Sequence, residues 1–201
     1  SSNVYDGRSL EVDVHNQPLV LLAHGYLGRR FDMCHLAQRL ASQGFVCIAP
    51  EYPESLAASY ETNVDRATIN DLLLPQWQGA SAYGIVGHSL GCGTALQMDD
   101  SWTKVLVAGF AKRRDGTKVE GNMLLLTSMG DGLANRMLQQ PDAIPNDMVR
   151  LNPDQLPSPL PSRAALVYDG PAAPNHISFL DDADNDCMIQ FLSPLLPLAH
   201  A

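Results

Sequence analysis

Short runs of apolar residues alternate along the chain with longer stretches in which apolar residues recur every three or four positions. A continuous run of about five β-prone residues is typical of a strand that is buried on both faces of a sheet. The strands predicted on this basis are residues 10–14, 19–23, 45–49, 82–86, 104–110, 122–128 and 164–168.

Helical spacing of apolar residues fills the stretches between these runs. It predicts helices over residues 31–43 and 63–77, a helix that begins at Leu90, and a closing helix over 188–196. Gly44 follows the first helix and is expected to be its C-cap. Strands that alternate with helices indicate an α/β fold, with a mostly parallel central sheet and helices on both faces.

Residues 141–161 contain six prolines, so we expect one long connection there rather than regular structure. The sequence shows no internal repeat and no boundary between domains. A length of 201 residues suits a single domain, and we predict that residues 1–201 form one.

The composition narrows the classes of function. Apolar residues make up 45% of the chain, which is enough for a packed core, and 22 acidic against 13 basic residues give a net charge of −9. Because no basic stripe is present to neutralise phosphates, nucleic-acid binding is disfavoured. No apolar run approaches the roughly 20 residues that span a bilayer, so we expect no integral membrane segment.

The sequence leaves the compartment open. It lacks an initiator Met and shows no signal-peptide pattern, so we expect a processed or trimmed chain, with secretion and an organelle both open. The four cysteines are Cys34, Cys47, Cys92 and Cys187. Their even number allows two disulfides, but we expect buried free thiols, because a domain of this size needs no covalent staples.

The strongest chemical signal is the run Gly-His-Ser-Leu-Gly at residues 87–91. This G-x-S-x-G pattern directly follows a predicted strand and precedes a predicted helix. In that context Ser89 sits on a strained turn that projects its Oγ above the edge of the sheet. The helix that begins at Leu90 directs its positive dipole end at the same point. We therefore predict that Ser89 is a nucleophile rather than part of a plain turn.

A serine nucleophile needs a base and a group that orients the base. In this arrangement the acid and then the histidine follow the serine along the chain, each after a later strand. His176 lies in the loop after the last predicted β-strand and is the expected base, in preference to His200. Asp131 follows the strand over 122–128 and is the expected acid, with Asp115 in reserve.

The segment His-Gly-Tyr-Leu-Gly at residues 24–28 follows another predicted strand. The backbone N–H groups of Tyr26 and Leu90 are expected to form an oxyanion hole. The expected substrate-binding residues are Gly25, Tyr26, Leu27 and His88. His24 is expected to hold the loop. Nucleotide binding is disfavoured, because the loop lacks the third glycine of a dinucleotide fingerprint and the lysine of a P-loop.

The acidic residues Asp181, Asp182, Asp184 and Asp186 raise the alternative of a calcium site. Their spacing does not match an EF-hand loop, so we expect a solvated surface there. We predict no metal and no organic cofactor.

Taken together, residues 19–192 resemble the α/β-hydrolase superfamily. The stretch HGYLG…LAQRLASQGFVCIAPEY at residues 24–52 is similar to the group of dienelactone hydrolases, platelet-activating-factor acetylhydrolases, chlorophyllases and bacterial polyester hydrolases. Residues 176–182 resemble the H-x-x-x-L-D-D ending of chlorophyllases and the H-x-x-F-x-D ending of the acetylhydrolases. The elbow, with Leu90, departs from the G-H-S-R-G that is common in chlorophyllases.

The residues and the resemblance lead to one expectation of function. Residues 111–121 are too few for the helical cap that many lipases insert between these strands, so we expect an open groove without a cap. We expect a monomeric serine esterase with the triad Ser89, His176 and Asp131, acting on a small-molecule or lipid-like ester. A chlorophyllase, which cleaves chlorophyll to chlorophyllide and phytol, and a non-catalytic binding module on the same fold remain open.

Overall fold

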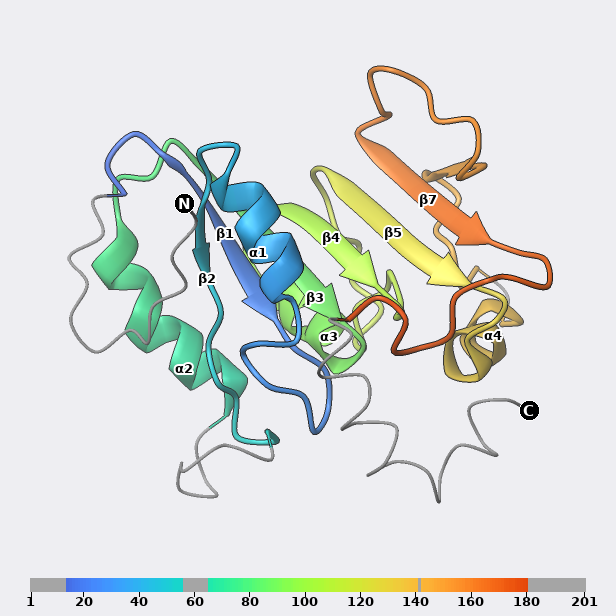
Figure 1. Ribbon diagram of the computed structural model, residues 1–201, viewed down its shortest axis with the longest axis horizontal. Helices are drawn as coiled ribbons and strands as arrows, with labels where there is room; N and C mark the ends of the chain where they lie inside the picture. The colour runs from blue at the N-terminus through green and yellow to red at the C-terminus, as the bar shows by residue number, and fades with distance from the viewer. Residues whose placement is uncertain (1–13, 56–64, 141, 181–201) are drawn as a thin grey trace.

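A computed structural model describes residues 14–55, 65–140 and 142–180 (Figure 1). Within these residues seven strands form one sheet in the order β2-β1-β3-β4-β5-β7-β6, and every pair is parallel. The strands are β1 Pro18–Ala23, β2 Val46–Ile48, β3 Ala82–His88, β4 Thr103–Val107, β5 Met123–Ser128, β6 Val149–Leu151 and β7 Arg163–Tyr168.

The strand order reverses between β1 and β3. From β1 the chain moves outward to β2, and it then crosses back to β3 on the other side of β1. Open parallel sheets bind ligands beyond the carboxyl ends of the strands at such a reversal. The segments that leave β1 and β3 are therefore placed for a functional site.

Helices cover both faces of the sheet. They are α1 Cys34–Ala41, α2 Arg66–Leu73 with a 3-10 turn over Leu74–Trp77, α3 Leu90–Gln97 and α4 Gly132–Leu138.

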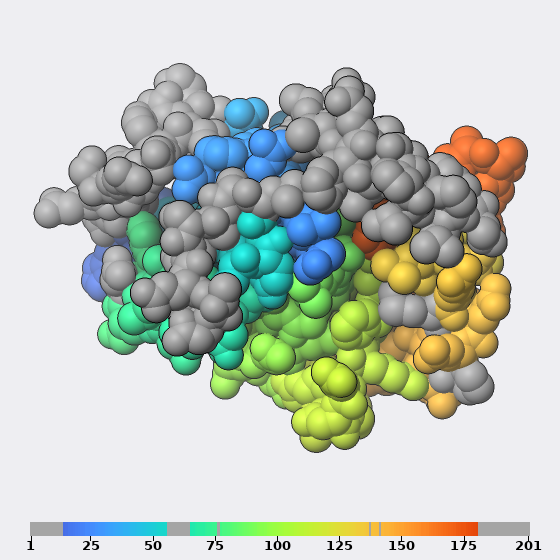
Figure 2. Space-filling view, turned by 90° about the horizontal axis from the view of Figure 1, so that it is seen from below, coloured from blue at the N-terminus to red at the C-terminus, as the bar shows by residue number. Residues whose placement is uncertain are grey.

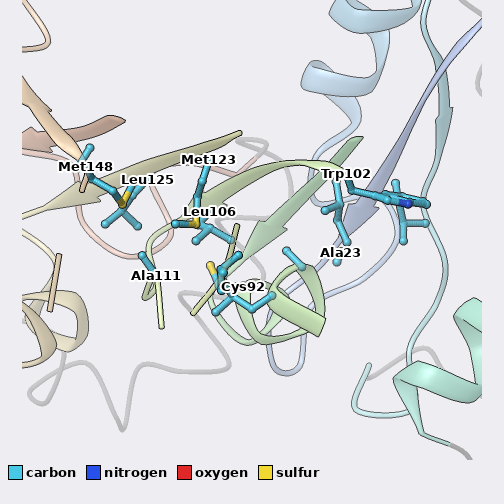
Figure 3. Close-up of a cluster of buried hydrophobic side chains, with 14 of the residues drawn as sticks. Ala23, Cys92, Trp102, Leu106, Ala111, Met123, Leu125 and Met148 are labelled. Atoms are coloured by element: carbon cyan, nitrogen blue, oxygen red, sulfur yellow. The ribbon is translucent and has the colours of Figure 1, made fainter. Parts of the chain in front are cut away.

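Side chains on β1 alternate between two core clusters, as the pleat requires. Leu21 packs in one cluster with Ile69 of α2 and Cys92 of α3, and Figure 3 shows part of this cluster. Leu22 lies in the other, against Leu36 of α1. The predicted fold class, a parallel sheet with helices on both faces, is confirmed.

Helix α1 is shorter than predicted, and its C-cap is Ser42. Gly44, the predicted C-cap, lies in the turn that follows. Its φ of +88° is in the left-handed region, which costs glycine little. The N–H of Gly44 donates to the carbonyl of Ala41, and that of Phe45 donates to the carbonyl of Leu40. These two bonds form a Schellman motif, which turns the chain directly into β2.

The prediction of one irregular connection over residues 141–161 is wrong in part, because β6 lies within it. Pro145 and Pro153 lie outside β6, so each of the three residues of the strand has an N–H group. The strand is at the edge of the sheet and pairs with β7 on one side. Helix α4 is a second element that the sequence did not predict. Strand β4 ends at Val107 rather than at residue 110, because Ala108 has a φ of +51°.

Several predictions fall on residues outside the described ones. They concern most of the strand over 10–14, the start of the helix over 63–77, the acidic run from Asp181, Cys187, the helix over 188–196 and His200.

The described residues also bear on the predicted cap, thiols and membrane segment. Residues 108–122, which connect β4 to β5, contain no helix and no strand, so no cap domain is present at this point. The thiols of Cys47 and Cys92 are free. Across residues 14–55, 65–140 and 142–180, no helix combines the length and the apolar character needed to cross a membrane.

Candidate active site

Ser89 lies at the sharp turn between β3 and α3. Its backbone has a φ of 53° and a ψ of −114°, a strained combination for a residue with a side chain. A 2.8 Å hydrogen bond from its N–H to the carbonyl of Val107 holds it in place. A Cβ on Gly91 would overlap the carbonyl of Ala23, and one on Gly87 would overlap the carbonyl of Gly91. Both glycines of the motif are thus required by close backbone packing.

His176 reaches Ser89 from the loop that follows β7. Its Nε2 is 2.8 Å from the Ser89 Oγ, and its Nδ1 is 2.7 Å from the Asp131 Oδ2. Because an ionised carboxylate only accepts hydrogen bonds, the proton of the neutral ring is on Nδ1. Nε2 is then free to accept the hydroxyl proton of Ser89, as a general base must.

Asp131 is fully buried and performs two tasks at once. Its Oδ2 accepts from His176, while its Oδ1 accepts from the N–H groups of Leu133 and Ala134 at 2.9 and 3.0 Å. The second pair of bonds caps the N-terminus of α4. The side chain is therefore fixed from both sides.

The reserve acid, Asp115, lies elsewhere. It is exposed, and its carboxylate accepts from the N–H and the hydroxyl of Thr117. These bonds lower the pKa of Asp115. The structure brings Asp131, and not Asp115, to the histidine.

The loop over residues 24–28 lies directly beside Ser89. The N–H of Gly28 donates to the carbonyl of Gly25 at 3.3 Å, and Leu27 has a φ of 59°, so residues 25–28 form a tight turn. In such a turn the N–H of the second residue, Tyr26, has no partner within the turn. A Cβ built on Gly25 would lie 3.2 Å from the Cβ of Ser89.

Leu90 supplies the second amide expected in the oxyanion hole. It is the first residue of α3, and first-turn amides have no acceptor within their own helix. Leu90 directly follows Ser89 in the chain, and Tyr26 directly follows Gly25, which lies beside Ser89.

Arg66 anchors this loop, and sequence reasoning missed it. Its buried guanidinium donates to the carbonyls of His24 and Gly25 at 2.8 and 3.3 Å, and also bonds Glu54 at 3.1 Å. It also lies 4.3 Å from the centre of the Tyr52 ring. One signal in the sequence could have indicated this role. Arg66 is one helical turn before Ile69 and two before Leu73, so its charge lies on the apolar face of α2.

His24 holds the same loop, as expected. Its Nε2 accepts from the N–H of Tyr52 at 3.0 Å, so its Nδ1 carries the proton and donates to the carbonyl of Gly25 at 2.8 Å. Burial is the main cause that lowers the pKa of His24. The ring is thus a neutral bridge between two backbone segments.

His88 does not occupy the substrate-binding position expected from the sequence. Its side chain is 2% exposed, and its Nε2 lies 2.8 Å from the carbonyl oxygen of His176. The ring is therefore turned into the protein, toward the backbone of His176 and away from the surface.

Exposed apolar side chains surround the carboxyl edge of the sheet. Tyr26 after β1 is 63% exposed, and Leu133 at the start of α4 is 51% exposed. Leu90 and Met129, which adjoin Ser89 and Gly130, are also exposed. Figure 2 looks onto the side of the molecule where these strand ends lie. We call Tyr26, Leu90, Met129 and Leu133 the apolar rim.

The described residues contain no group of three or more His, Cys, Asp or Glu side chains arranged to hold a metal ion.

Two solved structures are among those similar to the chain. Dienelactone hydrolase from Anabaena variabilis ATCC 29413 has a TM-score of 0.47 and 16% identity, covering 92% of this chain and 88% of its own. A putative dienelactone hydrolase from Klebsiella pneumoniae subsp. pneumoniae MGH 78578 has a TM-score of 0.45 and 15% identity, covering 91% and 88%.

No curated protein sequence matches the chain significantly. The model of the alpha/beta hydrolase family matches residues 20–200, nearly the whole chain. Together with the parallel sheet and the serine at the turn after β3, this match shows that the chain belongs to the alpha/beta hydrolase family.

Proposed function

We propose that this hydrolase cleaves carboxylic esters with Ser89 as its nucleophile. The observation that carries the proposal is the continuous hydrogen-bonded series from Asp131 through His176 to Ser89. Both distances are within the range for a nucleophile that is activated by an oriented base.

In the first half of the reaction, the Ser89 Oγ attacks the ester carbonyl carbon while the His176 Nε2 takes the hydroxyl proton. The carbonyl oxygen becomes an oxyanion, which the N–H groups of Tyr26 and Leu90 stabilise. Each such donor is worth about 3 kcal/mol in the transition state. His176 then gives its proton to the alcohol oxygen, the bond from that oxygen to the carbonyl carbon breaks, and an acyl-enzyme remains.

In the second half, water attacks the acyl carbon and gives a proton to the His176 Nε2. The tetrahedral intermediate collapses, and the bond from the acyl carbon to the Ser89 Oγ breaks while Oγ takes the proton from the His176 Nε2. The carboxylic acid is then released. Throughout, Asp131 accepts from Nδ1 and stabilises the imidazolium that forms in each half.

The apolar rim supports an ester with apolar groups, such as a lipid-like molecule. Exposed apolar side chains that cluster beside a reactive group are characteristic of binding surfaces for apolar ligands. The uncapped connection between β4 and β5 supports an open groove, which would accept extended substrates.

A panel of 4-nitrophenyl esters from acetate to palmitate, with chlorophyll alongside, tests the proposal. We expect hydrolysis of the nitrophenyl esters, and Ser89→Ala should lower kcat by several orders of magnitude while the circular dichroism spectrum is unchanged. Ser101→Ala, at an exposed position, is the matched control. A phosphonate probe should label wild-type Ser89. An unlabelled serine together with no hydrolysis would favour the binding module, and cleavage of chlorophyll alone would favour the chlorophyllase.

A further inference from the structure

His88 is buried between His176, the proposed base, and the loop over residues 24–28, and it contacts both. Its Nε2 lies 2.8 Å from the carbonyl oxygen of His176, and the two imidazole rings are 5.1 Å apart. On the other side, a Cβ built on Gly25 would lie 3.0 Å from the His88 Nδ1. One ring therefore fills the space between the segment that carries the base and the loop beside Ser89.

The hydrogen bond to His176 determines the form of the His88 ring. A carbonyl oxygen only accepts, so Nε2 carries the proton and Nδ1 is a bare acceptor. Nδ1 is buried and has no hydrogen-bond partner among the described residues. A second proton on that nitrogen would be both buried and unpaired, which is costly. Burial, followed by the nearby His176, accordingly lowers the pKa of His88 to about 4.

We propose that His88 is a positioning residue for His176, whose backbone it fixes by donating from Nε2 to the His176 carbonyl oxygen. The side chain of His176 has to meet Ser89 and Asp131 at once, at 2.8 and 2.7 Å. Backbone hydrogen bonds of its loop, such as those from Ala173 to Gly170 and from Ser178 to Asn175, join residues of the loop itself. A carbonyl that is fixed from outside the loop therefore limits how far the ring can shift. This role rests on the proposed function, because it concerns the base of that reaction.

Substitutions can separate this role from simple packing. His88→Gln keeps an N–H donor at a position close to that of Nε2, whereas His88→Leu fills a similar volume without a donor. His88→Asn is polar but too short to reach the carbonyl. A shift of about 1 Å in a catalytic group costs about a hundredfold in rate. We therefore expect His88→Leu and His88→Asn to lower kcat about a hundredfold, and His88→Gln to stay within about threefold of wild type.

The Michaelis constant should be nearly unchanged in all three variants, because a residue that is 2% exposed does not touch the substrate. A variant that merely loosened the protein would alter the melting temperature without this split between kcat and KM. His35→Leu, on the exposed surface of α1, is the matched control and should match wild type in both constants.

Nuclear magnetic resonance of the full chain with ¹⁵N-labelled histidine gives a readout that needs no ester. In wild type we expect His176 as the single Nδ1–H tautomer and His88 as the single Nε2–H tautomer. In His88→Leu, His176 should exchange between its two tautomers, whereas in His88→Gln it should keep the single Nδ1–H tautomer. If the leucine variant does not fold, His88→Asn replaces it as the variant without a donor. An Nδ1–H tautomer for His88, or an unchanged His176 spectrum and kcat in both donorless variants, would overturn the proposal. If the tautomers are as expected but no ester is cleaved, the proposed function fails and the positioning contact stands.

Discussion

Replacing Asp131 by asparagine should separate the two tasks of this side chain. Its Oδ1 caps α4 through the N–H groups of Leu133 and Ala134, and an asparagine Oδ1 can accept the same two bonds. The amide NH₂ must then take the place of Oδ2, 2.7 Å from the His176 Nδ1. There it presents a donor where the imidazole also presents a donor.

The imidazole responds by changing tautomer. With the proton on Nε2, His176 can no longer accept the hydroxyl proton of Ser89. The wrong tautomer in a serine triad costs about 10⁴ in kcat, which corresponds to about 5.5 kcal/mol of transition-state stabilisation. The loss of folding stability should be far smaller, about 1 kcal/mol, because a charge-assisted hydrogen bond is lost while the cap remains.

The assay is the steady-state hydrolysis of the best nitrophenyl ester, with thermal unfolding measured on the same samples. Asp131→Asn should lose at least about a hundredfold in kcat while its Tm falls by about 2–4 °C. Asp115→Asn is the matched control and should change kcat less than threefold. Should Asp115→Asn be the more damaging of the two, the acid would belong to the segment after β4, and its assignment from the hydrogen bonds of Asp131 would be refuted.

The contacts around the site support three further predictions. Gly91→Ala should lower the free energy of unfolding by about 3 kcal/mol or more, because its Cβ would overlap the last carbonyl of β1. The control is Gly93→Ala, two residues further along α3, where an added Cβ would make only ordinary contacts. It should be neutral or stabilise the fold by up to about 1 kcal/mol. Equal urea midpoints for the two variants would contradict the predicted difference. Arg66→Met should lower kcat about tenfold and destabilise the fold by about 3 kcal/mol, whereas Arg114→Met on the surface should do neither in the same assays. The pKa of His88 falls from 6.5 to about 4 on folding, so between these pH values the unfolded chain binds more protons and stability rises with pH. Acidification from pH 6.5 to 4 should therefore lower the free energy of unfolding by about 3 kcal/mol. His88→Gln should abolish this contribution to the pH dependence, as measured by unfolding curves across the same range.

Strands and the order of the candidate triad could be predicted because each depends on local sequence. Five-residue apolar runs mark strands that are buried on both faces, and such runs predicted β1 and β5. In a parallel sheet, residues that follow strand ends gather at one edge. The positions of Ser89, Asp131 and His176 relative to their strands were therefore enough to predict that the three side chains would meet.

Contacts between distant segments could not be predicted in this way. Arg66 binds carbonyls 41 and 42 residues away, and no local pattern encodes such a bond. Strand β6 has three residues in a proline-rich stretch, so its formation depends on the edge that β7 offers. The sequence shows that His88 is next to Ser89, but it does not show where the His88 side chain points. That orientation depends on the sharp turn at Ser89, which directs neighbouring side chains to opposite sides.

The three histidines of the site differ in role because they differ in burial and in hydrogen-bond partners. His24 and His88 each donate from one nitrogen to a backbone carbonyl, and burial lowers the pKa of both. His176 is less buried and meets a hydroxyl and a carboxylate instead. During the proposed reaction His176 becomes an imidazolium, and a second positive charge on a ring 5.1 Å away would oppose that step. A neutral His88 therefore serves the reaction in two ways, since the same burial that fixes its donor to His176 also keeps a competing charge away from the base.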